Sequence, residues 1–142
     1  MTVLVDTGVL YALADGEDSH HDACVHWLTR STDELLVPSL VIAEAAYLIG
    51  SRGGAQAEAS FLDGLAPGGR FGVAELDPGV DLVRVAELVR TYANLPLGTV
   101  DATVVATAER RGVREIATVD RRDFSIVRPA HVEAFSLVPD LG

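Results

Sequence analysis

Short apolar runs alternate along this chain with longer segments in which apolar and polar residues are mixed. Residues 3–5, 34–37 and 116–119 are the clearest runs of strand length, and residues 71–76 and 135–138 are weaker candidates. Short apolar runs separated by helical segments are typical of strands that are covered on both faces. The pattern therefore predicts a three-layer α/β/α domain with a mainly parallel central sheet.

The segments between these runs have apolar residues at helical spacing, and turn residues mark their ends. Ser19 is the expected N-cap of one helix, and Asp77–Pro78 is a typical start of another. Gly112 is expected to end the last helix. The predicted helices cover residues 9–13, 20–29, 39–49, 55–65, 78–94 and 99–111.

Two of these helices carry further expectations. The helix over residues 99–111 is less distinct than the others, because Thr103–Val105 would also suit a strand. The expected buried side of the helix over 78–94 consists of Leu82, Val83, Ala86, Val89 and Ala93.

No internal repeat or linker divides the chain, so residues 1–142 are expected to form one domain.

The composition excludes several classes of protein. At 142 residues and 49% hydrophobic content, the chain can bury a core and is not expected to be disordered. No apolar run is long enough to span a membrane, and residues 1–6 show no basic region or cleavage site. The single cysteine, Cys24, excludes an internal disulfide and suits a reducing cytosol. We therefore expect a cytoplasmic protein without membrane contact.

The charge is strongly acidic but unevenly distributed. The formal net charge is −10, and all eleven cations are arginines. Such a balance argues against a general nucleic-acid binder, since phosphate affinity comes mainly from lysine and arginine. Residues 110–128, however, hold six arginines against three acids, a local balance of +3. The acidity weakens a nucleic-acid function without excluding it.

Four acids stand where the apolar pattern does not favour charge. Asp6 and Asp120 each end an apolar run, whereas Glu44 and Asp101 each interrupt the apolar side of a predicted helix. A charge in an apolar setting costs several kcal/mol unless it is compensated. Taken singly, the first two could be helix caps and the other two could pair with arginines. Four acids of one sign, without a matching set of cations, favour a metal site.

The predicted fold would bring these acids together. Parallel strands end at one edge of the sheet, where α/β proteins bind their ligands, and Asp6 and Asp120 follow strands. Oxygen ligands without cysteine or histidine suit Mg²⁺ or Mn²⁺, and such a site can hydrolyse phosphodiester bonds. Thr7 and Thr118 are candidates to orient a ligand carboxylate or a bound water. Whether one or two ions bind is left open.

Three other functions can be weighed against this one. Asp6-Thr7-Gly8 is also the signature of aspartic proteases, but those are built from strands and would leave Glu44 and Asp101 unexplained. A phosphoacceptor receiver domain needs a lysine, and this chain has none. A non-catalytic RNA- or protein-binding module of the same fold is the remaining alternative, although such a module gains nothing from mutually repelling acids.

Each of the four acids lies within a short motif, and the motifs follow one another in order. They cover residues 3–7, 37–44, 95–102 and 117–124. Together they resemble the four acidic motifs of PIN-domain ribonucleases, and the likeness runs from residue 2 to about residue 138. The order, the spacing and the tail Phe135–Pro139 are most similar to the VapC toxins of bacterial type II toxin–antitoxin systems.

The resemblance implies a Mg²⁺- or Mn²⁺-dependent endoribonuclease with a PIN-like fold. It implies as substrate a structured RNA of the translation machinery, tRNA or rRNA, and as partner a VapB-type antitoxin whose C-terminal segment occupies the active-site groove. It also implies a homodimer. In one place the chain departs from the family, because Gly8 stands where a serine usually follows Asp-Thr. A hydroxyl is therefore missing beside the expected metal site.

Several charged residues near these motifs have open roles. Arg121 and Arg122 directly follow Asp120, which suits them to bind RNA phosphates or, alternatively, to neutralise the neighbouring acids. Arg52 is a further candidate for phosphate binding. Asp123 either completes the metal site or pairs with an arginine.

Overall fold

The computed structural model describes all residues from 1 to 142 as one parallel sheet with seven helices. The five strands are β1 (Thr2–Val5), β2 (Glu34–Pro38), β3 (Gly72–Ala74), β4 (Glu115–Ala117) and β5 (Ser136–Val138). The helices are α1 (Thr7–Ala14), α2 (His21–Arg30), α3 (Ser39–Gly53), α4 (Ala55–Asp63), α5 (Pro78–Thr91), α6 (Thr99–Arg111) and α7 (Arg122–Ile126). The predicted fold class is confirmed, and only the short α7 has no counterpart among the predicted helices.

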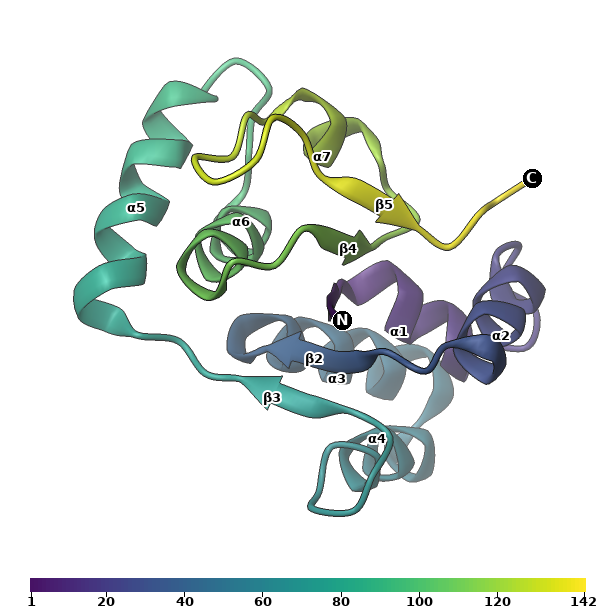
Figure 1. The fold of residues 1–142 in the computed structure, drawn as a ribbon. Coiled ribbons are helices and arrows are strands. Elements are labelled where there is room, and N and C mark those ends of the chain that lie inside the picture. Colours follow the sequence, from purple (N-terminus) through teal and green to yellow (C-terminus); the bar gives the residue numbers. More distant parts are fainter.

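The sheet has the strand order β3-β2-β1-β4-β5, and every neighbouring pair is parallel (Figure 1). In the register, Leu4 of β1 lies between Leu36 of β2 and Ile116 of β4. The chain moves outward from β1 to β3 and then returns across to β4 and β5. Because such crossovers are right-handed, α1–α4 cover one face of the sheet and α5–α7 cover the other.

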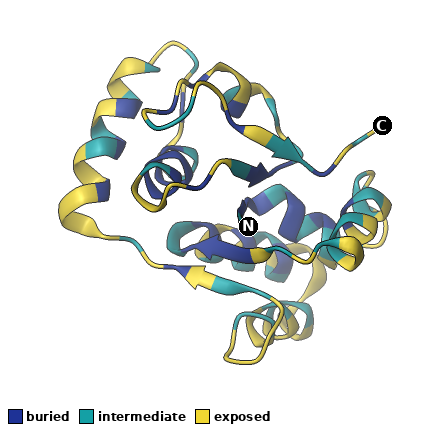
Figure 2. Ribbon diagram, viewed as in Figure 1, coloured by how far each residue is buried: buried dark blue, intermediate teal, exposed yellow.

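Burial explains the apolar runs that the sequence shows. Val3, Leu4 and Val5 of β1 are fully buried, as expected for a central strand covered on both faces. Helix α6 is buried along the continuous stretch Ala102–Ala108 and is largely dark blue in Figure 2, so it is enclosed on nearly every side. This all-round burial is why Thr103–Val105 also resembles a strand in the sequence, although it forms helix. No helix is both long and apolar enough to cross a membrane.

Helix α5 packs Val89 against the core as predicted, but the first half of its inward side differs from the prediction. Leu82 and Val83 are 45% and 62% exposed, whereas Asp81, Val85 and Leu88 are buried. The prediction was wrong because it counted apolar residues alone. Asp81 lies inside because Arg110 of α6 pairs with it, and this pairing turns the neighbouring apolar side chains toward solvent. Figure 1 shows α5 along one side of the molecule, outside α6.

The start of α2 also differs from the prediction. The helix begins at His21 rather than after a Ser19 cap, and His20 occupies the N-cap position. The carboxylate of Asp18 accepts a hydrogen bond from the His20 backbone N–H at 2.8 Å, which orders the turn before the helix. The predicted inward side of α2 is confirmed, since Cys24 is fully buried and Trp27 packs against the core.

Candidate active site

The candidate site lies at the carboxyl ends of β1 and β4, which are neighbours in the middle of the sheet (Figure 1). The connections from β1 and from β4 lead to helices on opposite faces, so the strand order reverses between these two strands. Helices that diverge in this way leave a crevice in which α/β proteins bind ligands. Asp6 directly follows β1, and Asp120 follows shortly after β4.

Asp6 is a buried carboxylate without a cationic partner. Its side chain is 6% exposed, and although it stands at the N-cap position of α1 it makes no capping hydrogen bond. Burial raises the pKa of Asp6 to about 6, and the charges of Glu44 and Asp120 add to this effect. Hydrogen bonds from the Thr7 backbone and the Thr118 hydroxyl offset only part of it. The interpretation of Asp6 as a simple helix cap therefore finds no support.

Asp101 projects toward Asp6 from the first turn of α6. The carboxyl group is half-buried, and the helix dipole at this position favours a negative charge. Nevertheless, burial raises the pKa of Asp101, and the nearby charges of Asp6, Asp123 and Glu44 raise it further, to about 8. Asp123 is therefore one of the neighbouring acids that make ionisation of Asp101 unfavourable. Asp123 thus lies against another acid, and it forms no ion pair with an arginine.

Glu44 and Asp120 lie at the rim of the crevice rather than inside it. Both residues are exposed. The prediction that Glu44 interrupts a buried stripe of α3 was wrong, because the buried side of that helix consists of Val41, Ala45 and Ile49. Glu44 lies next to that stripe, where α3 passes the start of α1. Of the four acids, Asp6 is buried and Asp101 is half-buried, so these two bear most of the cost of a charge in an apolar setting.

One cavity brings the four acids together. It has a volume of about 380 Å³ and is lined by Asp6, Thr7, Gly8, Glu44, Gly98, Thr99, Val100, Asp101 and Asp120. Two threonine hydroxyls accompany the acids. Thr118 Oγ1 donates to Asp6 Oδ2 at 3.1 Å, whereas Thr7 Oγ1 is buried without any hydrogen-bond partner. A buried hydroxyl without a partner is costly, so the Thr7 hydroxyl favours a ligand at this position.

The donor set fits a hard divalent cation. All of the charged groups are carboxylates, and none of the four acids forms an ion pair within the protein. As they stand, no three Asp, Glu, His or Cys side chains converge closely enough to form a complete ligand set. Mg²⁺ is commonly held by one or two carboxylates together with several waters. The cavity suits this kind of site better than a protein cage that encloses the ion.

The three candidate arginines have different surroundings. Arg121 donates to the backbone oxygens of Thr118 and Pro139, so it holds the C-terminal segment against the end of β4. Arg122 is exposed at the start of α7 and has no partner. The guanidinium of Arg52 lies over the Tyr11 ring, with its carbon 5.0 Å from the ring centroid. This contact was not predicted, because Tyr11 and Arg52 belong to different helices and only the fold brings them together.

The contact between Gly8 and Val119 explains why glycine follows Thr7. A Cβ atom on residue 8 would lie 2.5 Å from Val119 Cγ2, which is far inside van der Waals contact. The side chain of Val119 therefore occupies the space that a serine would need. This close approach brings the first turn of α1 against the segment that carries Thr118 and Asp120.

Comparison with known proteins identifies the family. The model of the PIN domain matches residues 3–128. The chain therefore belongs to the PIN-domain family, as its acidic motifs predicted. Among individual proteins, it is similar to Ribonuclease VapC26 of Mycobacterium tuberculosis (strain ATCC 25618 / H37Rv), with 34% identity over 137 residues. These residues are 96% of this chain and the whole of that relative, so the predicted resemblance to VapC proteins is confirmed.

Solved structures show the same fold. VapC20 of Mycobacterium tuberculosis, described as a sarcin-ricin loop cleaving toxin, superposes with a TM-score of 0.79 at 19% identity, over 92% of this chain and 98% of that one. VapBC2 of Rickettsia felis, bound to a DNA fragment from its promoter, superposes with a TM-score of 0.69 at 15% identity, over 98% and 100%. At these identities the likeness concerns the fold alone.

Proposed function

We propose that this protein is a metal-dependent endoribonuclease toxin that hydrolyses phosphodiester bonds, acting as a single domain over residues 1–142 in the cytoplasm. The observation that carries the proposal is the pair Asp6 and Asp101, two carboxylates that lie in one cavity without a cation and whose pKa values are raised. Folded proteins seldom keep such a costly arrangement unless a ligand compensates it. The name of the similar Ribonuclease VapC26 is consistent with this chemistry.

The metal would be Mg²⁺, with Mn²⁺ as a substitute, held by Asp6 and Asp101 together with Glu44, Asp120 or Asp123. When bound, such an ion stabilises the charge that develops on the phosphate oxygens during hydrolysis. The protein's own residues position the carboxylates that would hold the ion. The Thr118 hydroxyl donates a hydrogen bond to one oxygen of Asp6. Because Thr118 is fully buried, this bond holds the Asp6 carboxylate in one orientation. The Thr7 hydroxyl is free to orient a water or a phosphate oxygen.

The RNA backbone would run past this cavity along its arginine-bearing rim. Arg122 is exposed and unpartnered next to the site, so we assign it a phosphate contact. Arg52 lies on the α1–α3 side and also has free donors. Arg121 has backbone partners already, so its contribution to phosphate binding would be the smallest of the three.

The proposed substrate is a structured RNA of the translation machinery, either tRNA or rRNA. Among structures with the same fold, VapC20 is described as cleaving the sarcin-ricin loop, which is an rRNA target. The similarity to that protein does not transfer its target to this one. Mapping of the cleavage ends distinguishes the two classes of RNA.

Two protein partners complete the proposal. The proposed partner is a VapB-type antitoxin, which is supported by the VapBC assemblies of Rickettsia felis and Salmonella typhimurium that share this fold. This antitoxin would cover the active-site groove. A second copy of the chain would form a homodimer. We assign to this interface the exposed apolar side chains of Val73 on the edge strand β3 and of Val80 and Val83 on α5, which it would bury.

The test is cleavage of total RNA by the purified protein with Mg²⁺, with EDTA, and by the Asp6→Asn variant, with the RNA ends mapped. We expect discrete cuts that leave 5′-phosphates and that disappear both in EDTA and in the variant. Cuts that persist in EDTA would contradict metal dependence. A folded wild-type protein that cuts no RNA under any condition would indicate a binding module instead.

A further inference from the structure

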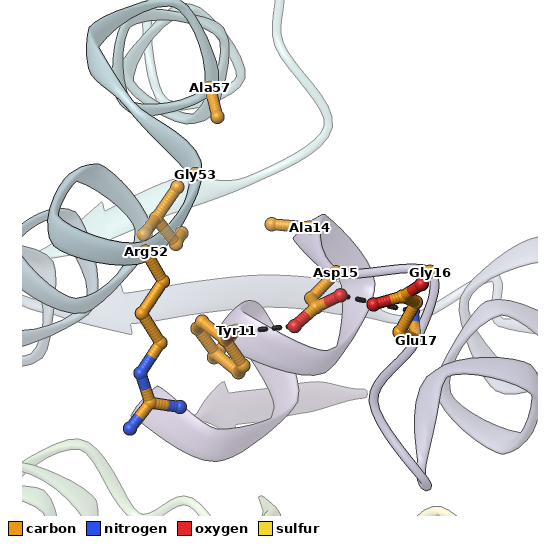
Figure 3. A pocket seen from close by; sticks show the side chains of 9 residues that line it. Tyr11, Ala14, Asp15, Gly16, Glu17, Arg52, Gly53 and Ala57 are labelled. Carbon is orange, nitrogen blue, oxygen red and sulfur yellow. Dashed lines mark hydrogen bonds between the residues drawn. The ribbon is translucent and has the colours of Figure 1, made fainter.

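A second cavity lies beside α1 and is shown in Figure 3. It encloses about 230 Å³ between α1 with its following loop, the end of α3 and the start of α4. Thr7 and Gly8 line the acidic cavity, and Tyr11 lines this one. Residues three and four apart share one face of a helix, so the two cavities follow one another at a distance of about one turn, or roughly 5.4 Å.

The aromatic wall of this cavity is held in place. The Tyr11 hydroxyl donates to Asp15 Oδ2 at 2.6 Å, and Asp15 Oδ1 accepts the backbone N–H of Glu17 at 3.0 Å (Figure 3). These bonds fix the ring and order the loop, and the Tyr11 hydroxyl in turn lowers the pKa of Asp15. A pre-ordered aromatic side chain loses little conformational entropy when a second ring packs against it.

Arg52 lies beside this ring and pairs with no carboxylate. Figure 3 shows its side chain reaching from the end of α3 to Tyr11. The guanidinium carbon is 5.0 Å from the ring centroid, and Arg52 takes part in no hydrogen bond to a carbonyl and in no ion pair. Arg84 and Arg110, in contrast, each pair with carboxylates. A stacked guanidinium with free donors suits a base face and a phosphate at the same time.

Two carboxylates at the cavity, Glu17 and Asp15, determine which chemical groups it can bind. Glu17 is exposed and its carboxylate has no partner, and Asp15 adds a second negative charge. Two carboxylates against one guanidinium repel an additional phosphate in the interior. They attract hydrogen-bond donors, and the donors that RNA offers at a base edge are ring N–H and exocyclic amino groups. Since one water takes about 30 Å³, the cavity has room for several waters, or for one planar base.

We propose that this cavity is a subsite for one nucleobase of the RNA next to the scissile bond, and that it prefers bases with an exocyclic amino group over uracil. The base packs against the Tyr11–Arg52 stack, the Arg52 donors hold the adjoining phosphate, and Glu17 accepts from the base edge. Guanine should bind most tightly, because its N1–H and N2–H₂ donate side by side to one carboxylate. The proposal rests on the proposed ribonuclease function for its substrate, but it has a separate test.

The test measures binding rather than cleavage. The full-length Asp6→Asn protein is titrated with single-stranded oligo(U), and with the same oligonucleotide carrying one G, A or C, and binding is followed by fluorescence anisotropy. A single G should raise the affinity about fivefold or more, as a two-donor base contact does. Glu17→Gln should abolish this preference, so that the oligonucleotide with one G binds this variant no more tightly than oligo(U) does. Tyr11→Ala should weaken binding of every RNA by at least about fivefold.

Matched variants separate this role from a structural one. Arg90→Ala removes an exposed arginine of α5 that has no partner, so it should change neither affinity nor base preference. Tyr11→Phe retains the ring while losing the bond to Asp15, so it should keep most of the affinity that Tyr11→Ala loses. Circular dichroism of each variant verifies that it is folded.

The outcomes distinguish the subsite from the nuclease. A base preference that survives in Glu17→Gln, or normal RNA binding by Tyr11→Ala, would overturn the subsite. Variants that bind RNA normally but lose affinity for an antitoxin peptide would overturn it in favour of a protein contact. A base preference without any RNA cleavage by the wild-type protein would instead overturn the nuclease and leave the subsite standing.

Discussion

Two groups of acids in this protein have opposite surroundings. Asp81 and Glu109 lie between α5 and α6, and each receives two hydrogen bonds from one arginine, at 2.9 and 3.0 Å from Arg110 and at 2.7 and 2.9 Å from Arg84. Asp6 and the acids around it share one cavity, and none of them forms an ion pair with an arginine. Both groups contain a nearly inaccessible aspartate, so burial alone does not distinguish them.

The pKa values show what the difference means. Burial alone would raise the pKa of Asp81, but hydrogen bonds from Arg110 and from the Asp77 backbone lower it. Burial also raises the pKa of Asp6, and its neighbours reinforce the shift because they are acids. The first group stabilises the fold. The second group is destabilising by itself, and such sites are where function is commonly found.

The largest effect expected from this comparison concerns activity. Asp6→Asn and Asp101→Asn should each reduce RNA cleavage roughly 10²- to 10³-fold, the range observed when one electrostatic stabiliser of a transition state is removed. Glu133→Gln, at an exposed position outside the four motifs and outside the cavity lining, is the matched control and should cleave at the wild-type rate. Measured cleavage rates check this. Wild-type rates in either aspartate variant would contradict the site assignment.

The next effect concerns stability, which should fall when an acid of the arginine-paired group is changed and not when an acid of the cavity is changed. Asp81→Asn leaves Arg110 without its ion partner, and we expect the free energy of unfolding to fall by about 2–3 kcal/mol, because half of a buried pair remains. Asp101→Asn in EDTA should leave the free energy of unfolding unchanged or raise it, because one of several repelling charges is lost. Urea unfolding of both variants measures this. Equal losses would show that both groups are structural.

The pH dependence of stability follows from the same contrast. Asp6 binds its proton more tightly in the folded than in the unfolded state, since its pKa is raised from 3.8 to about 6. The folded state then holds more protons, so the free energy of unfolding of the metal-free protein falls as the pH rises through this range. Between about pH 5 and pH 8 we expect Asp6 alone to contribute a loss of about 1–2 kcal/mol.

Asp81 and Glu109 should not contribute in that window. Their pKa values are lowered, so their stabilisation is fully present above the usual carboxylate range and is lost only in stronger acid. Urea unfolding in EDTA across this pH range tests the prediction. Adding Mg²⁺ should flatten the decline, and Asp6→Asn should reduce it without metal. A stability that rises toward pH 8 in EDTA would contradict the prediction.

The smallest effect concerns the close approach that assembles the acids. Gly8→Ser should cost on the order of 1 kcal/mol through overpacking against Val119, and it should also lower cleavage by displacing α1 from the Asp120 segment. The double variant Gly8→Ser/Val119→Ala should recover both properties. Unfolding and cleavage assays on the three variants form a double-mutant cycle. Strictly additive effects would mean that the two side chains do not interact.

Most of the fold follows from patterns that are local in sequence. The buried runs 3–5 and 35–37 are typical of strands because central parallel strands are apolar on both faces, and glycines and prolines mark the helix ends. Helix α5 is the exception. Its inward face carries Asp81, and only the arginine of another helix makes that placement favourable.

The candidate site could be predicted as a set of residues but not as an arrangement. The four acids stand out by sequence alone, because each interrupts or ends an apolar pattern. Sequence does not distinguish Asp6, which is 6% exposed, from Glu44, which is exposed at the rim. Burial depends on what packs across the crevice, and those neighbours come from distant parts of the chain. The catalytic roles of these residues stay predictions until cleavage is measured.

The sequence by itself determined the class of this protein: an acidic, single-cysteine α/β chain with four ordered acidic motifs, which belongs to the PIN-domain family. Only the tertiary structure decided which acids lack partners, why residue 8 is glycine, and that Tyr11 and Arg52 form a second cavity beside the first. Motifs and periodicity are encoded by neighbours along the chain. A pKa, an unpartnered hydroxyl or a stacked arginine depends instead on distances between residues that only folding brings together.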